Sequence, residues 1–529
     1  MGTEARPATR LPPWIGALRN ALILLVLWEL AGRFQLVASG ALPPPSAVLA
    51  RLWVDRGDYP DHVLATLQGA FGGFLIGNVI AIVAGIVFAL YPLASRLMRG
   101  LNVAVFALPA IAISPILVLT LSGYAPRYAL AAIGCYFTTM TATVIGLTQV
   151  DARSMDVVRA YGGNRWTALR LVQWRSALPV IVSGLRIAAP NAVLGSILAE
   201  FGGGGRYGLG AYLLGSLGRG EPDRLWGIGL MATLIAGLAY GFFALIARAV
   251  TKGSMAVTIP ASPPRADSER GVAGWQKAGL TLGSLLLPFA LWWLALAALH
   301  IPSLIAKTPA DLFTYLFLSP MAATAQQRLL GALAQTLPFT LVGMVAGLAF
   351  ACALALTTQV YPGIVRAFMP VALVTQTMPL VALTPLLVLM LGRGPGVILW
   401  ITISVTFFPA FVTISQGLLL VPTAALDLPR AYGATVWKQL RLVSIPASLP
   451  YLFAATRLTV PRALLGVMIA EWLATGTGLG NLLNQSRGYL DYGMIWTVAV
   501  TSVIISVALY QIVAAIERRT LRRLGMAVE

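Results

Sequence analysis

The residues of this 529-residue chain that could do chemistry are the few charged side chains inside or at the ends of long apolar runs. They are Arg186, Glu200, Arg457, Arg462 and Glu471. A charged side chain at the centre of a membrane helix costs about 2.5–3.5 kcal/mol on insertion scales, so each needs a structural or a functional reason. The structural reasons are capping, ion pairing and contact with lipid. The functional reasons are attraction of an anion into a transport pathway and gating of its outer end.

Residue types that support catalysis or metal binding are scarce. The two histidines, His62 and His300, are far apart in sequence, and no G-x-x-x-x-G-K-[ST] phosphate loop occurs. The glycine run at residues 202–205 lacks the Lys-Ser/Thr that such a loop needs and is interpreted as a plain loop. The two cysteines both fall in apolar runs, so no disulfide framework is expected. The sequence predicts no catalytic residue, no metal and no cofactor bound by this chain.

One polar segment occurs twice in the sequence. Residues 156–179 read DVVRAYGGNRWTALRLVQWRSALP, and residues 427–450 read DLPRAYGATVWKQLRLVSIPASLP. The 271-residue offset also pairs Arg186 with Arg457 and Glu200 with Glu471, whereas Arg462 has an asparagine as its counterpart. A repeat this long indicates a duplicated domain, because solenoid units have periods of about 20–50 residues.

Each copy of the segment predicts a short helix, a glycine turn and a second helix. Gly162 and Gly433 suit the left-handed residue that closes a helix. Asn164 and Thr435 follow and are good N-caps. The second amphipathic stretches are Arg165–Gln173 and Val436–Ser444. One interpretation is an interfacial helix pair with snorkelling arginines. The other is a docking site for a partner, since ten of the 20 aligned positions from Asp156 and Asp427 onward are identical although the surrounding spans have drifted much further.

Composition places the chain in a membrane. Hydrophobic residues make up 58% and charged residues 10%, with a mean hydropathy of +0.82, whereas soluble domains carry about 25% charged residues. Runs long enough to cross a bilayer, about 20 residues, occur six times in each half. In the first half they lie near residues 16–38, 65–91, 102–122, 127–149, 179–201 and 225–249. In the second half they lie near residues 277–300, 335–360, 367–391, 394–420, 449–472 and 492–515. The prediction is an all-α membrane protein with about 12 transmembrane helices in two parallel six-helix repeats.

The distribution of basic residues predicts the orientation. With the N-terminus taken as cytoplasmic, 23 of the 37 Lys and Arg residues fall in inner segments, 11 in outer segments and three within spans. Both polar segments then face the cytoplasm, as do the N- and C-termini. The net charge of +19 is explained by these inner loops, so no nucleic-acid partner is expected. The expected domains are a first half at residues 1–250, a flexible cytoplasmic linker at 251–276 and a second half at 277–529.

The two polar segments resemble the cytoplasmic coupling loop of binding-protein-dependent ABC importer permeases. The signature of that loop is E-A-A, a Gly six residues after the Glu, and an I-x-L-P whose Pro lies thirteen residues after the Gly. Asp replaces the Glu in both copies, Gly162 and Gly433 match, and the Pro is present only in the second copy, as Pro446, with Arg175 in its place in the first. Further segments, such as residues 42–49 (LPPPSAVL) and 73–77 (GFLIG), are similar to nitrate/sulfonate/taurine-type permeases.

The resemblance implies two type I importer permease domains fused in one inner-membrane chain that has no ATPase site of its own. It implies two copies of an ABC ATPase subunit, which bind ATP and Mg, and an extracytoplasmic substrate-binding protein as partners. The first coupling loop would use Asp156, Arg159, Ala160, Tyr161, Gly162, Asn164 and Trp166. The second would use Asp427, Arg430, Ala431, Tyr432, Gly433, Thr435, Trp437 and Pro446. The five charged residues named first remain candidates for the pathway or its gate.

One alternative and one question stay open. Twelve spans in two parallel halves also describe a major-facilitator secondary transporter. Against it, the loop after the second span lacks the expected Asp, and only Glu29, Glu200 and Glu471 are expected near the bilayer to couple protons. The cargo stays undecided among nitrate, sulfonates, taurine and heterocyclic precursors, and the positive in-span residues favour an anion.

Overall fold

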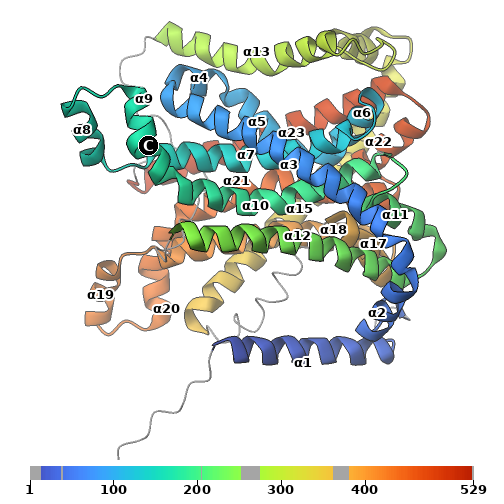
Figure 1. Ribbon diagram of the computed structural model, residues 1–529, viewed down its shortest axis with the longest axis horizontal. Helices are drawn as coiled ribbons and strands as arrows, with labels where there is room; N and C mark the ends of the chain where they lie inside the picture. The colour runs from blue at the N-terminus through green and yellow to red at the C-terminus, as the bar shows by residue number, and fades with distance from the viewer. Residues whose placement is uncertain (1–12, 37–39, 204, 252–273, 362–379, 527–529) are drawn as a thin grey trace, which may run out of the picture.

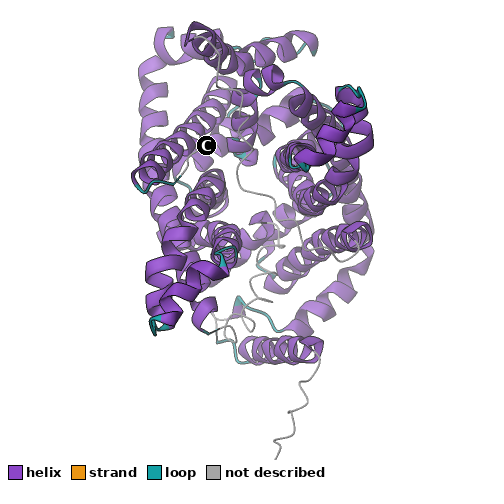
Figure 2. Cartoon of the chain, turned by 90° about the vertical axis from the view of Figure 1, so that its left-hand side faces the viewer, coloured by secondary structure: helices purple, strands orange, loops and turns teal. Residues whose placement is uncertain are grey.

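The computed structural model describes residues 13–36, 40–203, 205–251, 274–361 and 380–526. Within these ranges the chain is built of helices joined by turns and contains no strand (Figure 2). The first half holds α1 (Pro13–Arg33), α2 (Pro45–Val54), α3 (Tyr59–Leu90), α4 (Pro92–Leu97), α5 (Arg99–Ala107), α6 (Ala110–Thr120), α7 (Ala125–Thr148), α8 (Ala152–Ala160), α9 (Arg165–Ala168), α10 (Trp174–Phe201), α11 (Leu209–Ser216) and α12 (Pro222–Thr251). The second half holds α13 (Gly274–Ala298), α14 (Pro309–Phe313), α15 (Ala322–Val360), α17 (Leu380–Leu391), α18 (Pro395–Leu419), α19 (Thr423–Ala431), α20 (Val436–Gln439), α21 (Ile445–Ala470), α22 (Gly478–Gly488) and α23 (Tyr492–Arg523).

The predicted all-helical membrane protein is confirmed, but the count of twelve spans is not. Nine helices among the described residues are long and apolar enough to cross a membrane, or ten if α5 and α6 count as one bent span. The run predicted at 102–122 is divided into these two helices, which meet at 97°. Pro109 lies at that break, where its missing N–H removes one helical hydrogen bond. Helix α1 is not among the nine, and most of the run predicted at 367–391 lies outside the described residues.

Close helix packing in each half depends on small residues, as is usual in membranes. Helix α3 packs on α7 through glycines, and a Cβ added to Gly73 would come within 2.6 Å of the Tyr128 carbonyl oxygen. In the second half α15 packs on α18 in the same way, and a Cβ on Gly343 would come within 2.7 Å of the Thr402 Cβ. Glycine at these positions lets the backbones approach, so the matched glycines of the repeat maintain matched helix pairs.

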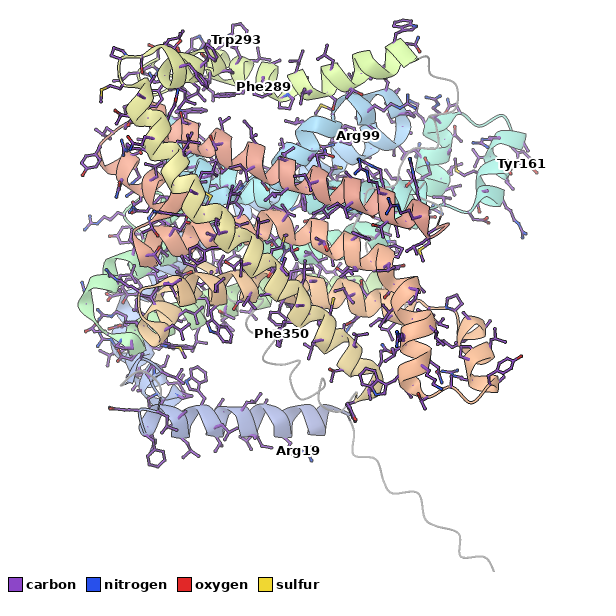
Figure 3. All side chains as sticks on the ribbon, turned by 180° about the vertical axis from the view of Figure 1, so that it is seen from behind. Arg19, Arg99, Tyr161, Phe289, Trp293 and Phe350 are labelled. Carbon is purple, nitrogen blue, oxygen red and sulfur yellow. The ribbon has the colours of Figure 1, made fainter. Side chains whose placement is uncertain are left out.

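The two halves interlock through short helices of their third spans. Helix α6 of the first half packs on α21 and α23 of the second, and α17 of the second half packs on α10 and α12 of the first. One large apolar core therefore contains residues of both halves. On the outside, apolar side chains such as Phe289, Trp293 and Phe350 remain exposed (Figure 3). Such exposure is expected of a surface that faces lipid. The predicted linker, residues 251–276, lies almost wholly outside the described residues.

Candidate functional site

The two repeated polar segments form two helical hairpins that project from the same end of the molecule (Figure 1). The first hairpin consists of α8 and α9, and the second consists of α19 and α20. Helices α11 and α22 lie at the opposite end (Figure 1). The predicted order of helix, turn and helix is confirmed in both copies.

The turn of each hairpin is set by glycine. Gly162 and Gly433 have φ values of 72° and 70°, in the left-handed region that only glycine enters at no steric cost. The Gly162 and Gly433 N–H groups donate to the Arg159 and Arg430 carbonyls, both at 2.9 Å. The free backbone groups at each helix end are thereby satisfied, and the angle between the two short helices is fixed.

The hairpins differ in how they are braced. In the first, Asn164 caps α9 by accepting a bond from the Thr167 N–H at 2.9 Å. Its second helix is also tied to neighbouring spans, because Gln173 Nε2 donates to the Leu147 carbonyl at 3.0 Å. In the second hairpin Thr435 occupies the cap position but makes no side-chain capping bond. There, Gln439 Nε2 donates to the Ala434 carbonyl at 2.8 Å and braces the turn from within.

Both hairpins expose apolar side chains at matched positions. Tyr161 and Tyr432, at the turns, are 89% and 84% exposed. The other exposed members are Val157 and Trp166 in the first hairpin, and Leu428 and Trp437 in the second. The label of Tyr161 marks the tip of its hairpin, away from the bundle (Figure 3). Apolar patches that project into water are typical of protein interaction sites.

The predicted acid–base pairs of the hairpins are present but exposed. Arg159 contacts Asp156 at 3.2 Å and Arg430 contacts Asp427 at 3.4 Å. Exposed pairs of this kind contribute at most about 1 kcal/mol. These four residues therefore add charge to the surface of the hairpins and little to their stability.

One interpretation of the sequence was that the second helix of each hairpin is a separate interfacial helix, and the structure does not support it. The second helix continues through a π-helical turn, Leu169–Gln173 or Leu440–Ser444, directly into a span. The continuous segments are Arg165–Phe201 and Val436–Thr475. At 1.5 Å per residue the first is about 55 Å long. Each hairpin is thus one end of a rod that crosses the molecule.

A buried glutamate lies at the other end of each rod. Glu200 accepts bonds from Thr66 Oγ1 at 2.8 Å and from the Gly210 N–H at 2.7 Å. The Leu209 N–H donates to the same Thr66 hydroxyl. We call these four residues the Glu200 cluster; it ties α10 to α3 and α11. Glu200 is 1% exposed.

The second half repeats this arrangement. Glu471 accepts bonds from Thr336 Oγ1 at 2.7 Å and from the Gly480 N–H at 2.9 Å, and the Leu479 N–H donates to Thr336. We call these four residues the Glu471 cluster. Both glutamates had been considered as contacts for a binding protein or as a gate, and the structure places them inside the protein. The matched register of Thr66 and Thr336 was the available signal for their partners.

The two clusters differ in one charged neighbour. Arg127 of α7 lies 3.9 Å from Glu200 and is itself buried. The positions 270 and 271 residues later are the uncharged Val397 and Ile398, and among the described residues Glu471 forms no ion pair. The two clusters therefore share their hydrogen bonds, and only the Glu200 cluster has a neighbouring cation among the described residues.

One arginine missed in the sequence connects the halves at this end. Arg487 of α22 donates from Nη1 to the carbonyl of Phe201, the last residue of α10, at 3.2 Å. Its guanidinium also lies 5.6 Å from the ring centre of Trp472. Leu217 occupies the matching position in the first half, in the register that pairs Leu209 with Leu479, so comparison of the repeats gave no signal for this contact.

The three predicted in-span arginines have different environments. Arg186 donates to the Tyr240 hydroxyl and stacks over that ring. Arg457 pairs with Glu517 of α23 at 3.0 Å and is 7% exposed. Glu517 lies beyond the end predicted for the last span, so the sequence had missed a buried carboxylate. Arg462 forms no hydrogen bond or ion pair with any residue that the structure describes.

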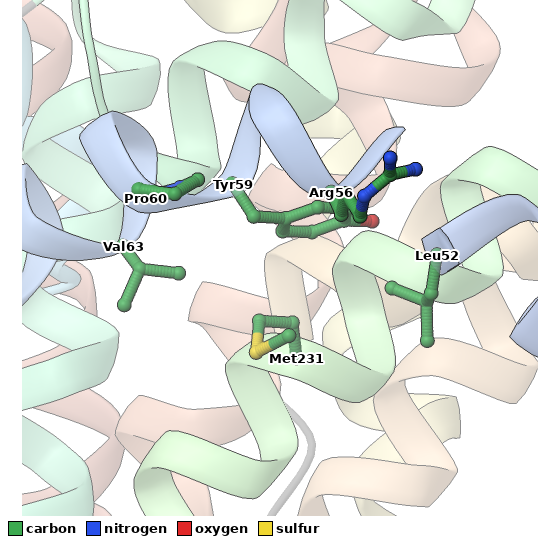
Figure 4. A pocket seen from close by; sticks show the side chains of 6 residues that line it. All are labelled: Leu52, Arg56, Tyr59, Pro60, Val63 and Met231. Carbon is green, nitrogen blue, oxygen red and sulfur yellow. The ribbon is translucent and has the colours of Figure 1, made fainter. Parts of the chain in front are cut away.

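A separate pocket of about 360 Å³ lies at the periphery, between the start of α3 and α12 (Figure 4). It is lined by Leu52, Arg56, Tyr59, Pro60, Val63 and Met231. Ligand sites usually combine apolar walls with several converging polar groups, and this lining supplies few. No group of three or more His, Cys, Asp or Glu side chains that could hold a metal occurs within the described ranges.

Comparison with known proteins agrees with this geometry. Two regions of the chain, residues 77–257 and 343–522, match the family described as binding-protein-dependent transport system inner membrane component. Each region contains one hairpin, the rod that follows it and all of one glutamate cluster except its threonine, Thr66 or Thr336. Together the regions cover more than half of the chain.

Several transport permeases are similar in sequence to parts of this chain. The chain is 31% identical to the riboflavin transport system permease protein of Chloroflexus aurantiacus over 157 residues, which are 30% of this chain and 59% of that protein. It is 29% identical to a probable ABC transporter permease protein of Haemophilus influenzae over 201 residues, 37% of this chain and 82% of that protein. It is 21% identical to the putative aliphatic sulfonates transport permease protein of Bacillus subtilis over 250 residues, 47% of this chain and 90% of that protein.

Since the family match covers both repeats, the chain belongs to the binding-protein-dependent transport system inner membrane components: it is a multi-pass ABC permease component with a duplicated domain, and it is not itself an enzyme.

Proposed function

We propose that this chain forms the complete membrane pathway of an ABC importer and moves a small polar or anionic solute inward by alternating access. Two ATPase subunits would dock on the two hairpins, and an extracytoplasmic binding protein would deliver the solute at the opposite end. The hairpins and both chain termini would face the cytoplasm, as the basic residues suggest. The proposed division is residues 1–250, a linker at 251–276, and residues 277–529.

The observation that carries this proposal is the pair of matched apolar patches at one end of the molecule. Each patch is presented by a capped, glycine-turned hairpin that is continuous with a span. A rigid element of this kind can convert movement of a docked subunit into movement of a whole half, which is what rigid-body switching requires. The clusters around Glu200 and Glu471 join the far end of each rod to its neighbours, so that each half would move as one body.

The names of the relatives do not identify one cargo for this chain. Their names refer to riboflavin, formylaminopyrimidine, aliphatic sulfonates and glycine betaine. For the secondary-transporter alternative, no observation among the described residues gives support. We therefore propose an ATP-driven importer, and the residues that line its pathway are the place to look for evidence of its solute.

The experiment is co-purification of the ATPase subunits with the tagged chain after Tyr161→Ala, Tyr432→Ala and both together. Each single change should lower recovery of the ATPase to about half, and the double change should abolish most of it, because aromatic anchors carry much of an interface's energy. Tyr489→Ala is the matched control, since Tyr489 is 78% exposed but lies beyond α22 at the opposite end. Full recovery with the double variant would refute docking on the hairpins.

A further inference from the structure

The rod of the second half has one accessible face in the middle of the protein. From Tyr451 to Ala470 every side chain is buried or only partly accessible, so neighbouring helices cover most of this part of α21. Leu458, Arg462 and Leu465 are among the few partly accessible positions there. They are spaced i, i+4 and i+7, which puts them on one side of a helix.

The first half has the same face. Ile187, Asn191 and Leu194 of α10 occupy the matching positions. Asn191 and Leu194 are partly accessible and Ile187 is 40% exposed, while their neighbours Ala188, Ala189, Ala192 and Val193 are buried. We call these two sets the α10 stripe and the α21 stripe. Helix α21 contacts α5 and α6 of the other half, and α10 contacts α17. Both stripes thus belong to helices that lie where the halves meet.

Arg462 lies near the centre of its rod. It is 17 residues beyond Ile445 and 13 before Thr475, about 25 Å and 20 Å along a helix. These distances are too long for its side chain to reach either end of the rod. Neighbouring helices cover most of this stretch of α21, and the Arg462 side chain nevertheless keeps accessible surface. An internal space next to α21 accounts for both facts.

The other arginines named above have partners, and Arg462 has none among the residues that the structure describes. Arg127 faces Glu200, Arg186 faces Tyr240, and Arg457 faces Glu517. Among the described residues nothing neutralises Arg462 or accepts a bond from it. A cation held without a partner at this depth costs several kcal/mol, so its retention is explained if a partner arrives with the cargo.

We propose that Arg462 is the cargo-binding residue of the pathway and that the cargo carries an oxyanion group, such as a carboxylate, sulfonate or phosphate. A guanidinium binds such a group with two parallel hydrogen bonds and stays charged at every physiological pH. Leu458 and Leu465 border it with apolar surface, which suits a solute with an apolar body. Asn191, at the matching position of the first half, is neutral, so the pathway has one anion site and not two. This inference rests on the proposed importer function.

The first test is accessibility in the chain reconstituted with its ATPase subunits in lipid nanodiscs. Cys135 and Cys352 are replaced by alanine, and single cysteines are introduced as Arg462→Cys and Ala463→Cys. Ala463 is the matched control because it is the next residue and is 0% exposed. A water-soluble thiol reagent should label position 462 about tenfold faster than position 463, since reaction follows exposure. Equal, slow labelling of both, with and without ATP, would overturn the proposal.

The second test is anion binding next to Arg462. In a Leu458→Cys variant, labelling by neutral N-ethylmaleimide is timed with methanesulfonate, acetate, methyl phosphate or choline present. At least one of the anions should slow labelling several-fold and choline should not. Arg462→Gln should remove the effect, and Arg462→Lys should keep part of it. No slowing by any anion, or equal slowing in Arg462→Gln, would overturn the anion site. If ATPase subunits co-purify in the same samples, a negative labelling result contradicts the cargo site only and leaves the proposed importer function supported.

Discussion

At the scale of single residues, the two glutamate clusters show one hydrogen-bond arrangement with two different electrostatic surroundings. Glu200 has Arg127 nearby, and Glu471 has no such cation within the described part of the chain. Breaking a buried ion pair by removing one partner costs about 3–5 kcal/mol, because the other charge remains buried. Losing an ordinary hydrogen bond costs about 0.5–1.5 kcal/mol. The same substitution should therefore have unequal effects in the two halves.

We predict that Glu200→Gln destabilises the protein by about 3–5 kcal/mol, and Glu471→Gln by about 1 kcal/mol. Thr336 and Gly480 donate to different oxygens of Glu471, so the amide oxygen of glutamine keeps one of these bonds and one is lost, whereas Arg127 would lose its carboxylate. Thermal unfolding of the two variants in the same detergent measures the difference. Equal losses, or a larger loss for Glu471→Gln, would show that the Arg127 contact contributes nothing.

A second residue-scale prediction concerns Asp55, in the turn between α2 and α3. Arg224 donates to it from Nε at 2.7 Å, and Arg51 from Nε at 2.9 Å. These bonds, that of Arg224 first, lower the pKa of the Asp55 carboxyl below its usual range. A lowered pKa stabilises the fold above the unfolded pKa of about 3.9, and that stability is lost as the pH falls through the folded value.

The melting temperature of the wild-type protein should therefore exceed that of Asp55→Asn by a constant margin between pH 7 and pH 5. Below about pH 4 the margin should shrink, because the wild-type carboxyl becomes protonated. Melting curves of both proteins over this range provide the measurement. A margin that is unchanged down to pH 3 would mean that Asp55 contributes by shape and not by charge.

At the scale of elements, the hairpin turn is the most sensitive point. Proline has φ fixed near −65°, so Gly433→Pro cannot adopt the observed +70° and should distort the second hairpin while the spans still form. We expect ATP-driven uptake to fall at least tenfold, with normal amounts of protein in the membrane. Gly241→Ala, at an uncrowded position in α12, should leave uptake unchanged. Normal uptake by Gly433→Pro would contradict the coupling role of the turn.

Local patterns in the sequence were sufficient to predict the hairpins. Glycine at 162 and 433 and a cap at Asn164 are decided by backbone sterics and a bond three residues away. The repeat then indicated that both copies fold alike. The cap at Thr435 was only half correct, since its position is right but its side chain makes no capping bond.

Other features depend on contacts that the local sequence does not show. The break at Pro109 resembles the prolines that α10 accommodates without a break, such as Pro190, so proline alone does not mark it. The π-helical turns occur in both rods, although only one is followed by a proline, Pro446. The contact from Arg487 to Phe201 joins residues 286 apart and has no copy in the first half.

At the scale of the whole molecule, Arg487 joins the two halves at the end opposite the hairpins. A hydrogen bond from a charged group contributes about 1.5–3 kcal/mol, enough to change a two-state equilibrium about tenfold or more. Arg487→Ala should therefore favour opening at this end and raise ATP hydrolysis by the docked subunits in the absence of cargo. Arg328→Ala is the control, because Arg328 pairs with Asp491 inside one half. An unchanged hydrolysis rate in Arg487→Ala would indicate that this contact does not hold the halves closed.

The central claim is that one polypeptide presents two equivalent docking sites for ATPase subunits. Native mass spectrometry of the complex purified through this chain tests it most directly, since the mass gives the number of bound subunits. We predict one copy of this chain with two ATPase subunits for the wild type, and one subunit after Tyr432→Ala weakens the second hairpin. A wild-type complex that contains a single ATPase subunit, or none, would contradict the account.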